Sequence, residues 1–290
     1  MIFITNNKSA KTEVSIRFPD WKAKAVTFSY DDGVLEDVKL VELFNKYGVK
    51  GTFNINSGSM GARKLGIFHA RLDLDTVSKI YTSGEHEVAM HTLTHPFLTK
   101  MNSAGVIYEV MQDKINLEKL TGAIVRGFAY PYGVYNDEIV DLLGKLCVTY
   151  ARTVNSTGGF SLPDNFLRLN PTCHHFDENL MKYAEEFINK SEDELTGRDP
   201  YLFYVWGHAY EFEDLDRWDV IENLLKTVSG KNNVWYATNI EIFDYINDFK
   251  RLIFNAERTR VFNPSSKEIY FEKMGEKYSV KAGQTIEILH

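Results

Sequence analysis

The sequence predicts an α/β fold in which parallel strands form a barrel and helices cover its outside. Strand-like and helix-like stretches alternate along most of the 290 residues, and this alternation is typical of a mainly parallel sheet. About seven strand–helix units can be counted, which fits a barrel better than an open sheet. The stretch 201–206 is almost wholly apolar, as expected for a strand that is covered on both faces.

The strands are recognised by short apolar or alternating runs, and the helices by apolar residues three and four positions apart. The predicted strands are 13–18 (at an edge), 23–30, 51–56, 87–90, 125–130, 148–151, 166–170, 201–206 and 234–236. The predicted helices are 34–47, 73–82, 103–120, 137–146, 180–188, 220–228 and 240–249.

After about residue 254 the pattern changes to short alternating stretches. They are separated by Pro264, Gly275 and Gly283, which are turn-forming residues. We therefore predict two units: a barrel over residues 1–253, and a small C-terminal β segment over residues 254–290 that packs on it.

Composition narrows the class of protein. The net charge is −7 and the chain has no run rich in Lys and Arg, so nucleic acid and anionic membranes are not expected partners. No apolar run approaches transmembrane length, and the N-terminus lacks the pattern of a secretion signal. We expect a cytoplasmic protein, although a secreted protein whose signal has been removed would look the same.

The two cysteines, Cys147 and Cys173, are too few and too far apart to indicate a disulfide framework or a cysteine metal site. Cys147 lies in an apolar setting and is expected to be buried.

Two adjacent carboxylates, Asp31 and Asp32, end the predicted strand 23–30, and the permissive Gly33 follows them. Either one could cap the next helix, but one Asp would be enough for that. Burial and mutual repulsion both disfavour two charges at a strand end, where α/β folds usually bind ligands. The pair indicates either a helix cap or a cation site.

His91 and His95 are four residues apart, so both rings can lie on one side of a helical turn and converge on one ion. The spacing alone is weak, and Thr92 stands where a zinc protease of this pattern would carry its glutamate. His91 follows a strand as Asp32 does, so both belong to the same rim of the barrel. Asp32, His91 and His95 would bind a divalent cation, with Asp31 left beside it as a base.

Two further stretches follow predicted strands. Residues 128–133 include Pro131, Tyr132 and Gly133, which form either a plain turn or a pocket wall that aims a backbone N–H at a substrate. His208 follows the buried strand 201–206 and is either a hydrogen-bonded structural residue or a member of the same pocket.

The order of these four stretches resembles the polysaccharide deacetylase family (carbohydrate esterase family 4). They read Tyr-Asp-Asp-Gly, His-Thr-Leu-Thr-His, Tyr-Pro-Tyr-Gly and a strand that ends in His, and the match spans residues 26–246. The resemblance implies a distorted (β/α)7-type barrel that removes acetyl groups from N- or O-acetylated mono-, oligo- or polysaccharides. It also implies one divalent metal, with zinc expected and cobalt, nickel or manganese as alternatives.

Carried over residue by residue, the resemblance assigns the metal to Asp32, His91 and His95. Asp31 becomes the base and His208 the acid. The backbone N–H of Tyr132 becomes the donor to the oxyanion.

The sequence departs from the family pattern in two respects. Many members have an Arg two residues before the Pro of the third motif, where this chain has Ala129; Arg152 is our candidate to orient Asp31 instead, ahead of Arg126. The Asp that tunes the catalytic His is not identifiable. Glu211 could orient His208 or bind sugar, and His174 and His175 could contact sugar or cap the strand. Trp206 and Tyr132 could stack on a sugar ring or be packing residues.

Two other functions use similar residues. Two His and one carboxylate also bind iron in Fe(II) oxygenases, but those usually have double-sheet β folds. A non-catalytic carbohydrate-binding relative is the second alternative, and the presence of a complete set of candidate catalytic residues argues against it. The sequence does not predict an oligomeric state.

Overall fold

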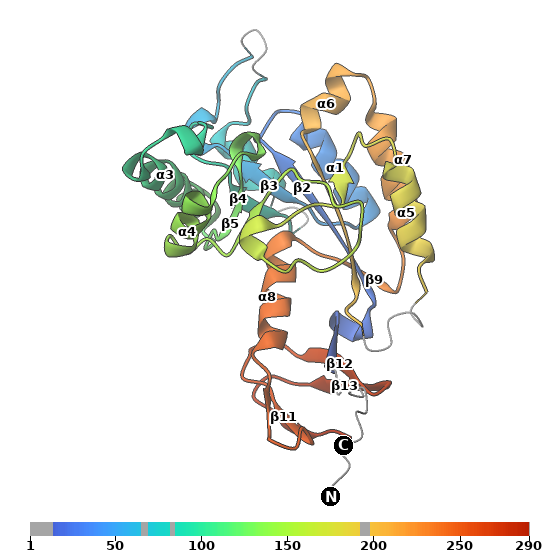
Figure 1. Ribbon diagram of the computed structural model, residues 1–290. Helices are drawn as coiled ribbons and strands as arrows, with labels where there is room; N and C mark the ends of the chain where they lie inside the picture. Colours follow the sequence, from blue (N-terminus) through green and yellow to red (C-terminus); the bar gives the residue numbers. More distant parts are fainter. Residues whose placement is uncertain (1–13, 65–68, 82–84, 192–197, 290) are drawn as a thin grey trace, which may run out of the picture.

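The computed structural model describes residues 14–64, 69–81, 85–191 and 198–289. Its body is a parallel sheet with the strand order β6-β5-β4-β3-β2-β8-β7 (Figure 1). The bounds of these strands are β2 Lys24–Asp31, β3 Thr52–Ile55, β4 Glu87–Met90, β5 Gly127–Ala129, β6 Tyr150–Arg152, β7 Cys173–His174 and β8 Tyr201–Gly207. A further strand, β9 (Val234–Tyr236), pairs with the first three residues of β2.

The two ends of the sheet approach each other through one short segment. Leu169 pairs in parallel with Arg152 of β6, whereas β7, a few residues later, pairs with β8. The segment thus connects the two ends of the seven-strand path. The predicted (β/α)7-type barrel is confirmed, and its distortion lies here.

Helices cover the outside of the barrel, with α1, α5, α6 and α7 on one side and α3 and α4 on another (Figure 1). Their bounds are α1 Asp37–Tyr47, α2 Leu74–Ile80, α3 Ser103–Thr121, α4 Asp137–Lys145, α5 Leu180–Asn189, α6 Ala209–Asp214, α7 Trp218–Val228 and α8 Asn239–Lys250. Among the described residues, none of these helices has the length and apolar character needed to span a bilayer.

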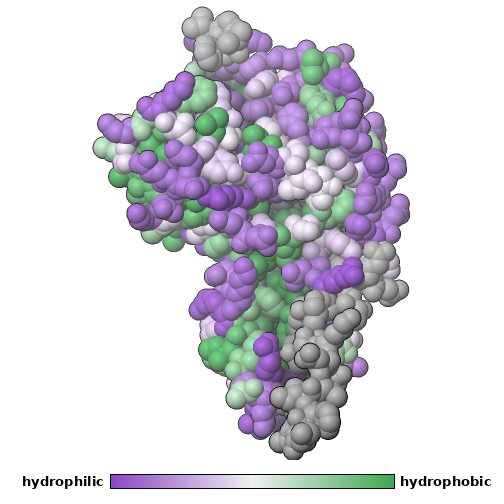
Figure 2. All heavy atoms as spheres, in the orientation of Figure 1, coloured by the Kyte–Doolittle hydropathy of each residue, from purple (hydrophilic) through white to green (hydrophobic). Residues whose placement is uncertain are grey.

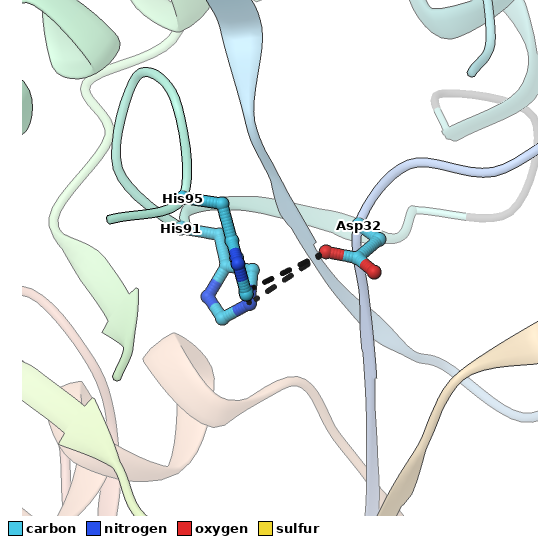
Figure 3. A group of neighbouring side chains, drawn as sticks. All are labelled: Asp32, His91 and His95. Carbon is cyan, nitrogen blue, oxygen red and sulfur yellow. Dashed lines mark hydrogen bonds and ion pairs between the residues drawn. The ribbon is translucent and has the colours of Figure 1, made fainter. Parts of the chain in front are cut away.

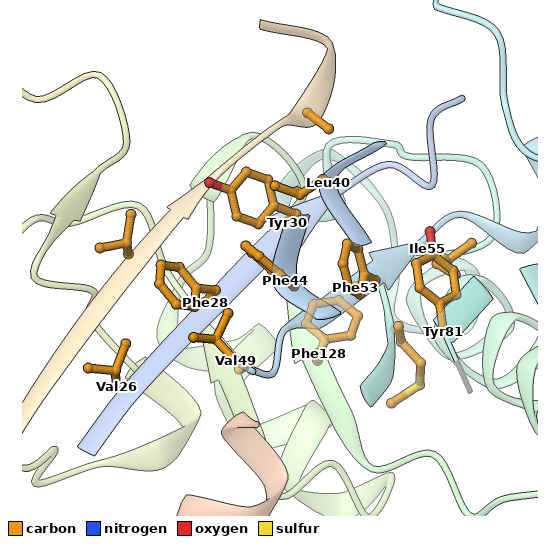
Figure 4. Packing of buried hydrophobic residues seen from close by; sticks show 14 of the residues in the cluster. Val26, Phe28, Tyr30, Leu40, Phe44, Val49, Phe53, Ile55, Tyr81 and Phe128 are labelled. Carbon is orange, nitrogen blue, oxygen red and sulfur yellow. The ribbon is translucent and has the colours of Figure 1, made fainter. Parts of the chain in front are cut away.

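The main core lies between the sheet and these helices. Phe44 of α1 packs on Phe28 and Phe53, at ring-centroid distances of 5.0 and 6.2 Å (Figure 4). Burial of such aromatic side chains is the largest favourable contribution to the stability of a fold of this kind. The periodic apolar residues that predicted α1 are the ones that pack here, although the helix begins at Asp37 rather than at residue 34.

One alternative from the sequence is excluded, and two predictions about local structure are wrong. Neither Asp31 nor Asp32 caps α1, because Glu36 is its N-terminal flanking residue. The predicted strand 166–170 begins as a 3-10 helix, Phe166–Arg168, in which the side chain of Asn165 accepts a hydrogen bond from Leu167 N–H. Cys147 is exposed because it follows the end of α4 with a φ of 61°, which turns its side chain outward.

The C-terminal part forms two small antiparallel sheets below the barrel (Figure 1). One contains β10 Ile253–Phe254, β11 Arg260–Phe262 and β14 Thr285–Glu287; the other contains β1 Val14–Arg17, β12 Ile269–Lys273 and β13 Glu276–Val280. The N-terminal strand β1 thus pairs with the C-terminal segment. The two-unit division remains a prediction, and residues 1–13 of its first unit lie outside the described residues.

A second hydrophobic core joins these sheets to the barrel. Tyr245 of α8, Tyr204 of β8 and Phe271 of β12 are all buried members of it. Figure 2 shows apolar side chains in the region where α8 enters the C-terminal sheets, on a surface that is otherwise mostly polar.

Candidate active site

A cavity of about 610 Å³ opens at the carboxyl ends of the strands, the rim where a barrel of this kind binds ligands. Charged, imidazole and aromatic side chains gather there from segments far apart in the sequence. They are Asp31, Asp32, His69, Arg71, His91, His95, Tyr130, Tyr132, Trp206, His208 and Tyr210, with Gly133 and Val154 completing the lining.

Asp32, His91 and His95 point toward one another in this cavity (Figure 3). The two Nε2 atoms lie 3.1 Å apart, and Asp32 Oδ1 lies 3.8 Å from Nε2 of His91 and 3.9 Å from Nε2 of His95. The structure therefore brings together the three residues predicted as metal ligands.

The chemistry of these three side chains fits a divalent cation. His91 Nδ1 donates to the carbonyl of Ala129 at 2.9 Å, so its lone pair is on Nε2, which faces the group. Desolvation lowers the pKa of both rings, to about 4 for His95, and they are neutral as ligands must be. Asp32 Oδ1 is buried and has no hydrogen-bond partner, which a bound cation would supply.

The predicted helical turn for His91 and His95 is wrong. The two residues lie on a loop in which Thr92 and His95 have φ values of 69° and 61°. These left-handed conformations, rather than helical spacing, bring the two rings together. The sequence identified the right pair of residues for the wrong local geometry.

Polar side chains from neighbouring elements hold this loop in place. Asp113 of α3 accepts hydrogen bonds from the backbone N–H groups of His91 and Ser57 at 3.0 and 2.9 Å. Glu109, one turn earlier on α3, accepts from the N–H and hydroxyl of Thr94 at 2.9 and 2.8 Å. Asn56 donates to the carbonyl of Thr92 at 3.1 Å. These contacts fix the position of the two imidazoles.

Asp32 stands in a strained turn. Its φ is 84° and that of Gly33 is 64°, and strained backbone of this kind occurs at functional sites. Arg71 Nη1 donates to the Asp32 carbonyl at 3.1 Å and lies 3.2 Å from Oδ2. Although burial alone would raise the pKa of Asp32, the positive groups around it lower that pKa to about 2. Arg71 therefore holds one carboxylate oxygen and leaves Oδ1 for the cation.

Asp31 is held differently from its neighbour. Arg152 donates from Nη2 to Asp31 Oδ2, and Asn54 Nδ2 donates to Oδ1 at 2.8 Å. Burial opposes ionisation of Asp31, but the guanidinium of Arg152 keeps its pKa below the usual value. Asp31 is consequently ionised and fixed in orientation beside the three ligand side chains.

The two candidate arginines are clearly separated in space. Arg152 is fully buried, and its guanidinium carbon lies 4.5 Å from the centroid of the Trp206 ring. Arg126 instead makes a two-pronged pair with Asp244 of α8, at 2.9 and 2.7 Å. Arg152 is therefore the arginine that contacts Asp31.

His208 follows β8 and faces the same cavity. Its Nε2 lies 3.9 Å from Asp31 Oδ2, and its Nδ1 lies 3.1 Å from Oε2 of Glu211. Tyr132 also lines this cavity; it is half exposed, stacked on Phe97 at 3.9 Å and edge-on to His95 at 4.3 Å. His174, His175 and Glu211 lie together, and none of them is among the residues that line the cavity.

Sequence reasoning missed Asn54, Asn56, Arg71, Glu109 and Asp113, which hold the site together. A signal for two of them was present. Glu109 and Asp113 fall on the buried stripe of α3, among Val106, Val110 and Leu117, where a carboxylate needs a partner.

Comparison with known proteins shows similarity to polysaccharide deacetylases. A family model described as polysaccharide deacetylase matches residues 19–151. A chitin deacetylase of Arthroderma benhamiae is 27% identical over 127 residues, which make up 42% of this chain and 31% of that protein. A protein of the same fungus, provisionally assigned as a peptidoglycan-N-acetylglucosamine deacetylase, is 25% identical over 127 residues, or 42% of this chain and 26% of that protein. The chain thus matches less than a third of the length of these curated relatives.

The fold also matches a solved structure. A Mycobacterium smegmatis protein, provisionally assigned as a polysaccharide deacetylase, superposes with a TM-score of 0.57 over 81% of this chain and 94% of its own. The sequence identity is 17%, so this likeness supports the fold alone.

Proposed function

We propose that the chain is a metal-dependent deacetylase of the polysaccharide deacetylase family, whose model matches residues 19–151. It would hydrolyse the acetamide, or an acetyl ester, of an acetylated saccharide and release acetate. The observation that carries the proposal is the position of Asp31 and His208, a fixed carboxylate and an imidazole, on the same cavity as Asp32, His91 and His95.

Asp32, His91 and His95 would hold one divalent cation, with zinc as the first candidate and cobalt, nickel or manganese as alternatives. When bound, such a cation polarises the acyl carbonyl and lowers the pKa of a water toward about 7. The neutral imidazoles and the carboxylate oxygen without a hydrogen-bond partner support this assignment.

The chain's own residues then divide the proton transfers. Asp31, ionised and held by Arg152 and Asn54, accepts the proton of the attacking water. His208 donates a proton to the leaving amine, which could not depart as an anion. Its pKa supports this role: burial opposes the charged ring, but the Glu211 carboxylate and Asp31 raise the pKa above its usual value. The backbone N–H of Tyr132 is the proposed donor to the oxyanion.

The substrate class is an acetylated saccharide that fits an open cavity of about 610 Å³. Trp206 and Tyr132 line this cavity and are candidates to stack on a sugar ring. The reaction of an Fe(II) oxygenase does not require a fixed base such as Asp31 or a proton donor such as His208. Acetate release, measured beside consumption of a 2-oxo acid, distinguishes the two functions.

The proposal is tested by replacing the base. Asp31→Asn keeps the shape of the side chain, so metal content should stay at one equivalent while acetate release from N-acetylglucosamine oligomers falls about 10²–10⁴-fold. The matched control, Asp75→Asn, changes an exposed carboxylate on α2 and should leave turnover unchanged. Full turnover by Asp31→Asn would exclude Asp31 as the base. No acetate release by the metal-loaded wild type from any acetylated saccharide would overturn the function.

A further inference from the structure

A cluster of three polar side chains lies behind His208. Glu211 belongs to the first turn of α6, His174 ends β7, and His175 follows it. Each offers one ligand atom, and these atoms lie within 4.8 Å of one another. Two roles fit such a cluster: a second metal site, or a network that holds His208.

The hydrogen bonds of His174 distinguish these roles. The backbone N–H of Phe176 donates to His174 Nδ1 at 3.2 Å, so in the neutral ring the proton is on Nε2. That Nε2–H donates to Oε2 of Glu211 at 3.1 Å. A metal on Nε2 would move the proton to Nδ1, where it would face the N–H of Phe176.

His91 in the candidate metal site has the opposite arrangement. Its Nδ1 faces a carbonyl oxygen, and its Nε2 lone pair faces the other two ligands. The cluster behind His208 is therefore built to donate hydrogen bonds to a carboxylate.

Glu211 in turn fixes His208. Its Oε2 accepts from the backbone N–H of His208 at 3.0 Å and from the ring Nδ1 at 3.1 Å. With Nδ1 engaged, the ring presents Nε2 to the cavity, 3.9 Å from Asp31 Oδ2. A carboxylate in contact with Nδ1 also stabilises the charged ring that a proton donor needs.

His175 closes the other side of the cluster. It is fully buried against Tyr30 and Phe212, and its Nε2 lies 3.3 Å from Oε2 of Glu211. The end of β8 passes so close that a Cβ at Gly207 would lie 2.0 Å from His175 Nδ1. This packing leaves Oε2 of Glu211 surrounded by nitrogen atoms.

We propose that Glu211 is a positioning residue that sets the tautomer and orientation of His208, and that His174 holds Glu211 in place. His208 and Trp206 line the cavity. Glu211, His174 and His175 are not among its described lining residues, so a sugar in the cavity would touch His208 first. The inference rests on the proposed function for the role of His208 as proton donor. Of the two roles that the sequence left open for Glu211, it favours orienting His208 over binding sugar, and it gives His174 a supporting role instead of a sugar contact.

The first test reads the tautomer without catalysis. In metal-loaded protein with ¹⁵N-labelled histidine, nitrogen chemical shifts should show the His208 proton on Nδ1 in the wild type. In Glu211→Ala the acceptor is gone, and the neutral ring should shift toward the Nε2–H form. An unchanged His208 spectrum in Glu211→Ala would overturn the proposal. Because no substrate is present, the result stands even if acetate release is never found.

The second test separates positioning from sugar binding by kinetics. Glu211→Ala should lower kcat on the order of 10²-fold and leave KM within about twofold. Glu211→Gln, which keeps an acceptor oxygen and the cap of α6, should recover part of kcat. Should Glu211→Ala fail to fold, His174→Phe covers the same question, since it removes the donor that holds Glu211 and should lower kcat in the same direction.

Glu213→Ala, an exposed glutamate on the same helix, is the matched control and should change neither constant. A rise in KM at constant kcat in Glu211→Ala would instead make Glu211 a sugar contact. A second equivalent of zinc in the wild type that is lost in Glu211→Ala or His174→Phe would make the cluster a metal site. Either result overturns the proposal.

Discussion

The adjacent residues Asp31 and Asp32 have the same side chain but different roles at this site. Asp32 leaves one oxygen free toward two imidazoles, whereas both oxygens of Asp31 accept hydrogen bonds from Asn54 and Arg152. The difference arises because successive side chains of an extended strand point to opposite sides, and the positive φ of Asp32 then turns it back toward the rim. Two environments thus separate a ligand from a base.

Arg152 is the residue whose loss should affect Asp31 most. Arg152→Met leaves a buried carboxylate without its cation, so we expect the free energy of unfolding to fall by about 3–5 kcal/mol. The base also loses its orientation, and kcat for acetate release should fall by at least about tenfold. Urea unfolding and steady-state kinetics measure the two effects.

Arg126→Met is the control, since Arg126 pairs with the partly exposed Asp244 and does not contact the site. It should keep kcat and lose little stability. Equal loss of kcat in both variants would contradict a specific role for Arg152.

The sequence indicated the site residues that occur in short motifs at strand ends, including Asp31, Asp32, His91, His95 and His208. It also offered Arg152 as the arginine that orients Asp31, because Arg152 follows the strand after the third motif. It could not place Arg71 or Asn54, since neither belongs to a motif and their contacts depend on how loops fold over the rim. Which side chains contact the site residues therefore depends on the tertiary structure.

At the scale of elements, helix α3 supports the loop that carries His91 and His95. Two carboxylates on its buried stripe, Glu109 and Asp113, accept hydrogen bonds from backbone and side-chain groups between residues 57 and 94. The loop itself has unusual backbone angles, with φ values of 69° at Thr92 and 61° at His95. The hydrogen bonds from this helix therefore fix the position of the loop.

Asp113→Asn should weaken metal binding without removing a ligand. An amide has one acceptor oxygen, so either Ser57 N–H or His91 N–H would face an NH₂ group instead of a carboxylate. Loss of a supporting contact of this kind typically costs about 10–100-fold in metal affinity. Competition with a chromophoric chelator measures the zinc Kd.

Asp141→Asn, on the exposed face of α4, is the matched control and should bind zinc as the wild type does. If Asp113→Asn shows the same Kd as this control, α3 does not support the ligands.

The strands and long helices could be predicted because each has a clear apolar period. The 3-10 helix Phe166–Arg168 could not, because its residues are as apolar as those of a strand and the hydrogen bond from Leu167 to Asn165 decides its conformation. The short α6 was also missed. It is capped by the contact between His208 and Glu211, a feature that no period reveals.

At the scale of the whole molecule, the C-terminal sheets share their core with the barrel. β1 and β12 pair along four residues, and Arg17 and Glu272 form a buried ion pair at 2.5 Å. Tyr245 of α8 donates to the carbonyl of Arg17 and accepts from the N–H of Tyr270. The alternating pattern predicted these short strands, but not that the first described strand of the chain would join them.

We therefore expect barrel and C-terminal sheets to unfold together. Phe271 is fully buried in the shared core, stacked on Tyr278 at 5.5 Å, and Phe271→Ala should lower the free energy of unfolding by about 3–5 kcal/mol. Calorimetry and urea unfolding should each show one transition that moves as a whole, while zinc affinity of the folded protein is unchanged. Met274→Ala, an exposed change at the tip of the same hairpin, should shift stability by less than about 0.5 kcal/mol. Two transitions, with only the first sensitive to Phe271→Ala, would mean that residues 254–290 fold independently of the barrel and that the shared core does not couple them.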